Sequence, residues 1–281
     1  MFPLFNKQSL GLILYHNNTM KIYIPTLGRS DKQITFSHLP KFLQDKTTLV
    51  VQPHEKHLYD NYPIMVLPKD WMGISRTRKY IIDNAGNNIF GIMDDDIELK
   101  RRFSESPTKR PLTEDDWKEF YNMTIEWLQN DVSFVGVRRG ILPPVGKDWI
   151  ENSETIVVTF YSGSKLPDTD ELNWNHDLLS EDVNLHLQLL LKGHKNRVWS
   201  KFGYVGEWAQ DGGCQEGPNK RTVDLINRSH EKLIQTYPDF VKWKTKDGVQ
   251  VFAQHQFTGH KMIKCLYNKA AKYNEVGRLS I

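Results

Sequence analysis

The chain has 281 residues, of which 39% are hydrophobic and 25% are charged, and its formal net charge is +3 with its ten histidines counted as neutral. This composition is typical of a folded globular protein and excludes a wholly disordered chain. No apolar run approaches the roughly 20 residues of a membrane span, and two cysteines cannot form a disulfide framework or a four-thiolate zinc site. We therefore expect a single α/β domain over residues 20–281, preceded by an extension of residues 1–19.

Strands and a helix alternate in the first hundred residues. Residues 74–85 form a helical pattern that ends at Gly86. Short apolar or β-branched runs predict strands at residues 21–24, 48–52, 64–67 and 89–93. This alternation predicts a Rossmann-like half over residues 20–100.

The remaining residues, 101–281, mix strands and helices, and we expect them to complete a mixed sheet and to form the acceptor side. Residues 101–111 are charged and flanked by proline, so we expect a surface loop there. Helices are predicted after the capping residues Thr113 and Ser180 and over residues 223–236. Strands are predicted at residues 132–137, 155–161, 196–199 and 203–208.

Three consecutive carboxylates, Asp94, Asp95 and Asp96, follow the apolar run of residues 89–93. Because burying three adjacent negative charges is too costly, they must lie at the solvent end of the strand, where a cation can neutralise them. Asp94 and Asp96 point to the same side of an extended chain and can together chelate Mg²⁺ or Mn²⁺, whereas Asp95 points away, toward a sugar or ribose. The alternative is a solvated acidic loop.

Charged side chains also stand at the start of two predicted helices. Arg76 lies in the first turn of the helix at residues 74–85, where a guanidinium can bind phosphate or an acidic group; a plain surface position is the alternative. Glu181 and Asp182 open the helix after Ser180. A carboxylate such as Asp182, held there toward a cleft, can act as a general base, although acidic residues are also common helix caps.

The order of these segments over residues 20–210 resembles that of a GT-A glycosyltransferase. The matching residues are Ile24-Pro25-Thr26 after the first strand, Gly73 and Arg76 on a helix, Asp94-Asp95-Asp96 after a strand, and Glu181-Asp182 opening a later helix. The resemblance implies a GT-A-like fold in which residues 20–100 bind the nucleotide-sugar. It implies donor contacts from Pro25, Thr26, Arg29, Arg76, Asp94 and Asp95, a Mn²⁺ or Mg²⁺ ion on Asp94 and Asp96, and Glu181-Asp182 as the catalytic pair of an inverting reaction.

This family often adds a histidine ligand near the C-terminus of the domain. His230, His255 and His260 are the candidates in this sequence, and the pattern does not choose among them.

Within the family, the chain resembles the phage-encoded branch that acts on hydroxymethylated DNA bases, in its length, its opening region and its Lys/Arg clusters. The resemblance implies transfer of glucose from UDP-glucose to the glucose on α-glucosylated 5-hydroxymethylcytosine in double-stranded DNA. It places this activity in the cytoplasm of an infected bacterium, without a membrane or an obligate protein partner. A polysaccharide or protein acceptor is one alternative, and a non-enzymatic nucleic-acid-binding protein is the other.

DNA bound for this reaction needs cationic side chains along its phosphates. The segment that follows the metal motif supplies five candidates, and a second pair follows the Gly212-Gly213 turn. They are Lys100, Arg101, Arg102, Lys109 and Arg110, and then Lys220 and Arg221.

Overall fold

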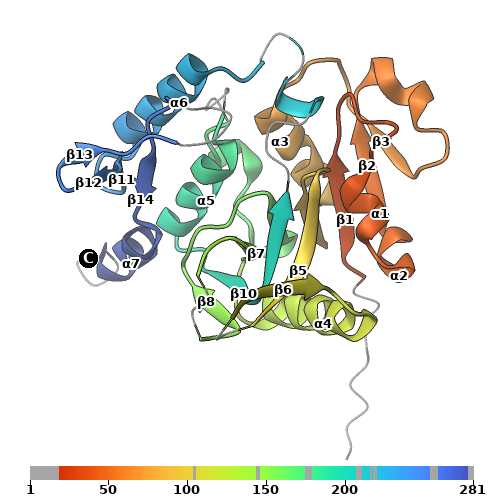
Figure 1. Cartoon of the computed structure of the whole chain (residues 1–281), viewed down its shortest axis with the longest axis horizontal. Coiled ribbons are helices and arrows are strands. Elements are labelled where there is room, and N and C mark those ends of the chain that lie inside the picture. The colour runs from red at the N-terminus through yellow and green to blue at the C-terminus, as the bar shows by residue number, and fades with distance from the viewer. Residues whose placement is uncertain are drawn as a thin grey trace, which may run out of the picture.

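The computed structural model describes residues 19–103, 106–143, 146–174, 179–206, 211–215, 217, 220–253 and 259–277. The expected extension, apart from residue 19, lies outside these ranges. Ten strands form one large sheet (Figure 1). They are β1 Lys21–Pro25, β2 Thr47–Val51, β3 Ile64–Val66, β4 Ile89–Met93, β5 Ile97–Phe103, β6 Ser106–Pro111, β7 Phe134–Arg139, β8 Trp149–Glu151, β9 Val158–Ser162 and β10 Asn196–Gly206.

The sheet has the order β3-β2-β1-β4-β9-β7-β10-β5-β6, with β8 also paired to β10. Strands β1 to β4 are mutually parallel, whereas β9 runs antiparallel between β4 and β7. The predicted mixed α/β fold is therefore confirmed. Because the carboxyl ends of parallel strands meet at one edge of a sheet, the segments after β1, β2 and β4 come together there.

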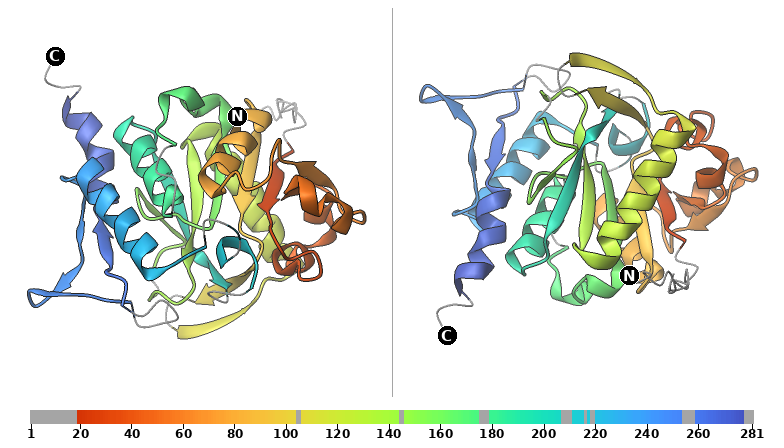
Figure 2. Two further views of the ribbon diagram at one scale, coloured as in Figure 1. Left: turned by 90° about the horizontal axis from the view of Figure 1, so that it is seen from above. Right: turned by 90° about the horizontal axis from the view of Figure 1, so that it is seen from below.

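Helices cover both faces of the sheet. They are α1 Ile34–His38, α2 Lys41–Gln44, α3 Ile74–Ala85, α4 Glu114–Asn130, α5 Glu181–Leu191, α6 Val223–Thr236 and α7 Tyr267–Gly277. Helix α4 crosses one face, as the view from below in Figure 2 shows, and buries Phe120 and Trp127 against Trp199. On the other face, α3 and α5 bury Ile81 and Leu187 in a second core.

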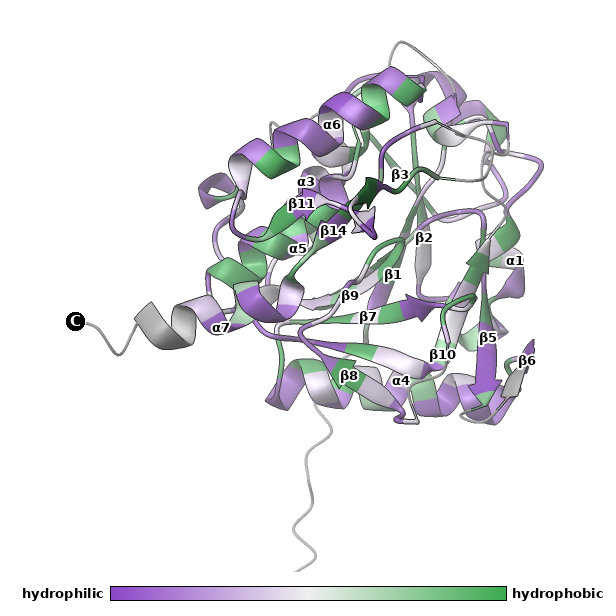
Figure 3. Cartoon of the chain, turned by 60° about the vertical axis from the view of Figure 1, so that its left-hand side comes forward, coloured by the Kyte–Doolittle hydropathy of each residue, from purple (hydrophilic) through white to green (hydrophobic). Residues whose placement is uncertain are grey.

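The charged residues 101–111 do not form the expected loop. Residues 101–103 and 106–111 belong to the antiparallel strands β5 and β6, in which Arg101 lies opposite Arg110. Strand β5 pairs with β10 and buries Ile97 and Leu99 before it becomes charged, and Figure 3 shows this change from hydrophobic to hydrophilic along the strand. The hairpin forms because backbone pairing with β10 and ion pairs of its arginines outweigh the charge of the segment.

The predicted strands at residues 196–199 and 203–208 form one strand, β10, whose register shifts between Trp199 and Gly203. Residues 207–208, the end of the second predicted strand, lie outside the described ranges. The predicted strand at residues 155–161 begins only at Val158, since Val157 has a left-handed backbone with φ of 69°.

The C-terminal elements form a smaller lobe beside the large sheet. Strand β11 (Val241–Trp243) pairs with β14 (Ile263–Cys265), and β12 (Thr245–Lys246) pairs with β13 (Val249–Gln250). Helix α7 packs against α5, which joins the lobe to the core. None of the helices in the described part of the chain is long and apolar enough to span a membrane.

Candidate active site

A cavity of about 580 Å³ opens at the edge of the sheet where β1, β2 and β4 end. Its wall includes the starts of α3 and α5, the end of β10, residues 212–215 and parts of the C-terminal lobe. Its volume lies in the range of small-molecule sites. Of the predicted site residues, it brings together Pro25, Thr26, Arg29, Asp94, Asp95, Asp96, Glu181, Asp182 and Arg221.

Arg78 joins the two acidic segments of the cavity. Its Nη2 lies 3.2 Å from Asp94 Oδ1, and its Nε donates to Glu181 Oε1 at 3.0 Å. The guanidinium is almost fully buried, with 3% of the side chain exposed. Burial opposes its charge, but Glu181 and Asp94 raise its pKa, so Arg78 stays charged. The start of α5 is thereby tied to the segment after β4.

Arg76 does not line the cavity; it is exposed on α3. We correct the expected position accordingly, because the buried stripe of α3 contains Ser75, Arg78 and Ile82. The spacing of three and four residues is a signal in the sequence that assigns Arg78, and not Arg76, to the inward face.

Arg29 holds the other end of the acidic tract. Its Nη1 pairs with the buried Asp95 and lies 3.0 Å from Asp96 Oδ2, and its Nε donates to the carbonyl of Asp211 at 2.9 Å. Arg29 therefore connects the segment after β1 to residues 211–215. Asp95 points into this buried pair, whereas Asp94 and Asp96 retain exposed fractions of 37% and 24% at the cavity wall.

The segment after β1 is fixed by a small polar network. Gln33 Nε2 donates to Thr26 Oγ1 at 3.0 Å and to the carbonyl of Arg29, and the hydroxyl of Tyr59 lies 3.5 Å from Thr26 Oγ1. All four side chains are buried. Pro25 ends β1 and stands at the start of this network. No pattern in the sequence points to Gln33 or Tyr59.

Burial raises the pKa values of three carboxylates in the cavity, Asp94, Asp95 and Asp182. Burial raises the pKa of Asp94 to about 8; Arg78 opposes the shift, and Asp96 and Glu181 add to it. Burial and the neighbouring Glu181 raise the pKa of Asp182 to about 7, against the attraction of Arg78. Burial also raises the pKa of Asp95, to about 6, and Arg29 opposes this shift. A carboxylate with a pKa near 7 can exchange a proton at neutral pH.

Ser180 turns the chain so that Asp182 reaches the cavity. Its φ of 62° is left-handed, and its side chain makes no capping hydrogen bond, which corrects the predicted Ser180 cap. Asp182 Oδ1 accepts a hydrogen bond from the backbone N–H of Val183 at 2.7 Å. A strained non-glycine backbone at this point is typical of residues that position a functional group.

Two of the three candidate histidines, His230 and His260, line the cavity, and their rings lie 6.0 Å apart. His230 Nδ1 is 2.8 Å from the carbonyl of Lys261, and burial lowers the pKa of this imidazole. The third candidate, His255, lies outside the described residues. Within the described ranges, no three His, Cys, Asp or Glu side chains stand close enough to hold a metal ion by themselves.

The structure places the expected DNA contacts of the β5–β6 hairpin outside the cavity lining. Arg101 pairs with Asp116 at 3.4 Å and Arg110 pairs with the same carboxylate at 2.5 Å. Lys100 pairs with Glu98, and Arg102 is buried and donates a hydrogen bond to the carbonyl of Leu142.

The other candidates differ in their exposure. Lys109 is half-buried and Lys220 is exposed. Arg221 alone of the seven lines the cavity, next to Cys214.

Known proteins resemble this chain in sequence. The family model of the TET-Associated Glycosyltransferase (TAGT) family matches residues 20–213. The Beta-glucosyl-HMC-alpha-glucosyl-transferases of Enterobacteria phages T2 and T6 are each 26% identical to this chain over 215 residues, which cover 71% of the chain and 75% of each relative.

Solved structures of glycosyltransferases resemble it more distantly. The S. aureus TarS 1–349 complex with UDP-GlcNAc matches with a TM-score of 0.45 and 11% identity, covering 76% of this chain and 66% of TarS 1–349. GalNAc-T7 with UDP, GalNAc and Mn²⁺ matches with a TM-score of 0.43 and 10% identity, covering 77% of this chain and 48% of that protein.

The family match spans the whole acidic cavity wall from Pro25 to Asp182 and extends to Gly213. It confirms the glycosyltransferase predicted from the order of the motifs. The chain belongs to the TET-associated glycosyltransferase family.

Proposed function

We propose that this protein is a metal-dependent, inverting glucosyltransferase that moves glucose from UDP-glucose to the glucose on α-glucosylated 5-hydroxymethylcytosine in double-stranded DNA. The observation that carries the reaction is Asp182, a carboxylate on the cavity wall whose pKa of about 7 suits a general base. The names of the phage T2 and T6 relatives support the acceptor. The same relatives support action in the cytoplasm of an infected bacterium.

Asp182 takes the proton of the acceptor hydroxyl as the hydroxyl oxygen bonds to the anomeric carbon. The bond between that carbon and the β-phosphate oxygen breaks, and UDP leaves with the bonding electron pair. One displacement from the opposite face inverts the anomeric centre, so an α-linked donor gives a β-linked product. Arg78 holds Glu181, the neighbour of Asp182, and so fixes the position of the base.

Asp94 and Asp96 offer oxygen donors that suit Mn²⁺ or Mg²⁺, and both reach the cavity. Burial raises the pKa of Asp94, with a smaller contribution from Asp96 and Glu181, and a bound cation would favour its ionised form. When bound, the ion would stabilise the charge that develops on the departing diphosphate. Asp94 and Asp96 would hold the ion from the protein side, and oxygens of the donor diphosphate would add to these two ligands.

This arrangement makes metal and nucleotide binding interdependent. In calorimetric titrations, Mn²⁺ alone should bind weakly and should bind at least roughly 10-fold more tightly once UDP is present. Asp96→Asn should remove this coupling. Equal UDP affinity in Mn²⁺ and in EDTA would contradict the metal role of Asp94 and Asp96. The assignment of Asp182 as the base would not be affected by that result.

The function itself is tested by transfer of labelled glucose from UDP-glucose. DNA with α-glucosylated 5-hydroxymethylcytosine should accept label, whereas DNA with unmodified cytosine and free oligosaccharides should not. The anomeric configuration of the new linkage should be β. Label on oligosaccharide or protein instead would favour a different acceptor, and no Mn²⁺-dependent donor turnover with any acceptor would favour a non-enzymatic binding protein.

A further inference from the structure

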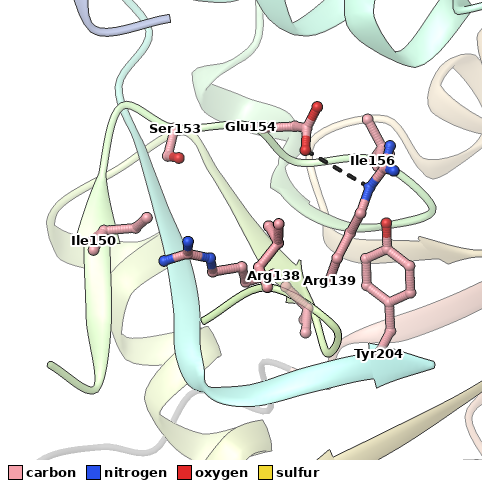
Figure 4. A pocket seen from close by; sticks show the side chains of 9 residues that line it. Arg138, Arg139, Ile150, Ser153, Glu154, Ile156 and Tyr204 are labelled. Carbon is pink, nitrogen blue, oxygen red and sulfur yellow. Dashed lines mark ion pairs between the residues drawn. The ribbon is translucent and has the colours of Figure 1, made fainter. Parts of the chain in front are cut away.

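A second, smaller pocket of about 100 Å³ adjoins the main cavity (Figure 4). It is formed by β7, β8, β10 and the segment before β9, and the two hollows share Arg139, Leu142, Glu154, Ile156 and Tyr204. Consecutive arginines on β7 line it. In Figure 4, Arg139 rises toward Glu154, with Nε 3.7 Å from Oε2, whereas Arg138 extends toward Ile150 on β8.

The positive charge of this pocket is not balanced. In the described part of the chain, the guanidinium of Arg138 makes no hydrogen bond or ion pair. The neighbouring Arg102 is 5% exposed and donates a hydrogen bond to the carbonyl of Leu142, but its Nη1 is buried and has no hydrogen-bond partner among the described residues. Burial and the charge of Arg138 lower the pKa of Arg102. Glu154, the one carboxylate that lines the pocket among the described residues, is shared with Arg139.

Arg138 and Arg102 repel each other, and the attraction of Glu154 only partly offsets this repulsion. Burial of an incompletely compensated charge such as that of Arg102 is costly. An anion in the pocket removes this cost, and an arginine fork matches the oxygens of a phosphate. The hydroxyl of Ser153 on the pocket wall supplies a further donor.

We propose that this pocket binds a backbone phosphodiester of the acceptor DNA strand, next to the modified base that enters the main cavity. The inference rests on the proposed function. The pocket lies on the acceptor side, because its shared wall with the main cavity comes from β7, β10 and the segment before β9, and Asp182 lines that same cavity. The predicted donor contacts Thr26 and Asp95 follow β1 and β4, which β9 separates from β7 and β10 in the sheet.

The test compares Arg138→Gln with the wild type for binding of a duplex oligonucleotide, followed by fluorescence anisotropy over a range of salt concentrations. We expect roughly 10-fold weaker binding and a log–log salt slope smaller by about 0.9, since one phosphate is no longer neutralised. Arg138→Lys keeps the charge and should keep the slope while its affinity falls. Lys41→Gln, which removes an equally positive side chain with 81% exposure on α2, should change neither.

Two further measurements distinguish a DNA phosphodiester from a donor diphosphate and from a structural role of Arg138. UDP affinity, measured by calorimetry, should be the same in Arg138→Gln and in the wild type. A fall in UDP affinity with unchanged DNA binding would assign the pocket to the donor diphosphate and overturn the proposal. The melting temperature of Arg138→Gln without DNA should equal or exceed that of the wild type, because a repulsive neighbour of Arg102 is gone. A lower melting temperature would indicate a structural role instead.

Failure of the phosphodiester assignment and failure of the proposed function give different results. If the wild type transfers glucose to DNA but Arg138→Gln binds DNA as tightly and with the same salt slope, the phosphodiester assignment is wrong and the function stands. If the wild type neither binds DNA nor transfers glucose to it, the DNA acceptor fails, and the phosphodiester assignment fails with it.

Discussion

A single guanidinium, that of Arg78, serves both acidic segments of the cavity. It contacts Asp94 after β4 and Glu181 at the start of α5, two positions that lie 87 residues apart in the sequence. The acidic tract is predictable, because three carboxylates after a buried strand must reach solvent or a cation. Its partner is harder to predict, since Arg76 and Arg78 differ only in which side of α3 they occupy.

Asp182→Asn should reduce kcat by about 10²–10⁴-fold and leave UDP affinity nearly unchanged, because the amide cannot accept the proton of the acceptor. In the wild type, kcat should rise with pH through about 7, the pKa at which Asp182 loses its proton. Steady-state kinetics and UDP calorimetry check both statements. Near-normal turnover in Asp182→Asn would remove this residue from the role of base.

The same raised pKa values make the fold less stable as pH increases. Asp94 is protonated in the folded protein up to a pKa of about 8, whereas an unfolded aspartate has already lost its proton near pH 4. Between these values the folded state binds more protons, so its stability falls as pH rises. The melting temperature should therefore decrease from pH 7 to pH 8.5, a window above the titration of ordinary histidines. Asp94→Asn should flatten this dependence, and an equally steep curve in that variant would contradict the assignment.

Helix α4 shows how far local signals determine an element. The sequence predicts Thr113 as its cap. The structure confirms it with a reciprocal capping box: Thr113 Oγ1 accepts a hydrogen bond from the backbone N–H of Asp116, and Asp116 Oδ2 accepts one from the backbone N–H of Thr113.

The loop predicted for the segment before this helix is wrong, because that segment forms the β5–β6 hairpin. Its pairing depends on β10, almost a hundred residues later, and on Asp116, which binds both Arg101 and Arg110. Such non-local partners leave no signature in a local stretch of sequence.

Thr113→Ala should destabilise the protein by about 1 kcal/mol, because it removes the acceptor of the Asp116 N–H. Chemical denaturation at neutral pH measures this change in stability. Thr113→Ser keeps the hydroxyl and is the matched control, with a much smaller change expected. A stability equal to the wild type in Thr113→Ala would show that solvent replaces the cap without cost.

At the scale of the whole molecule, the charge is unevenly distributed. Residues 220–281 contain 12 Lys and Arg against 5 Asp and Glu, whereas residues 1–219 contain 25 against 29. The C-terminal lobe is thus basic, and Lys244 and His260 place it on the wall of the cavity. The weak overall charge of +3 conceals this asymmetry, since the two parts nearly cancel.

Within the lobe, Lys242 of β11 lies directly opposite Lys264 of β14, and both are exposed. Like charges at facing positions of a sheet are destabilising, and a polyanion bound beside them would offset this repulsion. For the proposed DNA acceptor, we expect the duplex to lie along this face. The lysines of β11–β14 and β12 are better candidates than Arg101 and Arg110, which already form ion pairs with Asp116 and, for Arg101, with Glu119.

The triple variant Lys242→Gln, Lys246→Gln and Lys264→Gln should weaken duplex binding and reduce the log–log salt slope by up to about 2.7, which is about 0.9 for each phosphate that is no longer neutralised. UDP affinity should not change, because none of the three lines the cavity. The melting temperature should not fall, since the facing Lys242–Lys264 pair repels. Removal of two exposed lysines elsewhere, Lys41 on α2 and Lys118 on α4, is the control and should leave the slope unaltered. If the lobe variant has the slope of the wild type, the duplex follows another path across the molecule, and the charge of the lobe has a different partner.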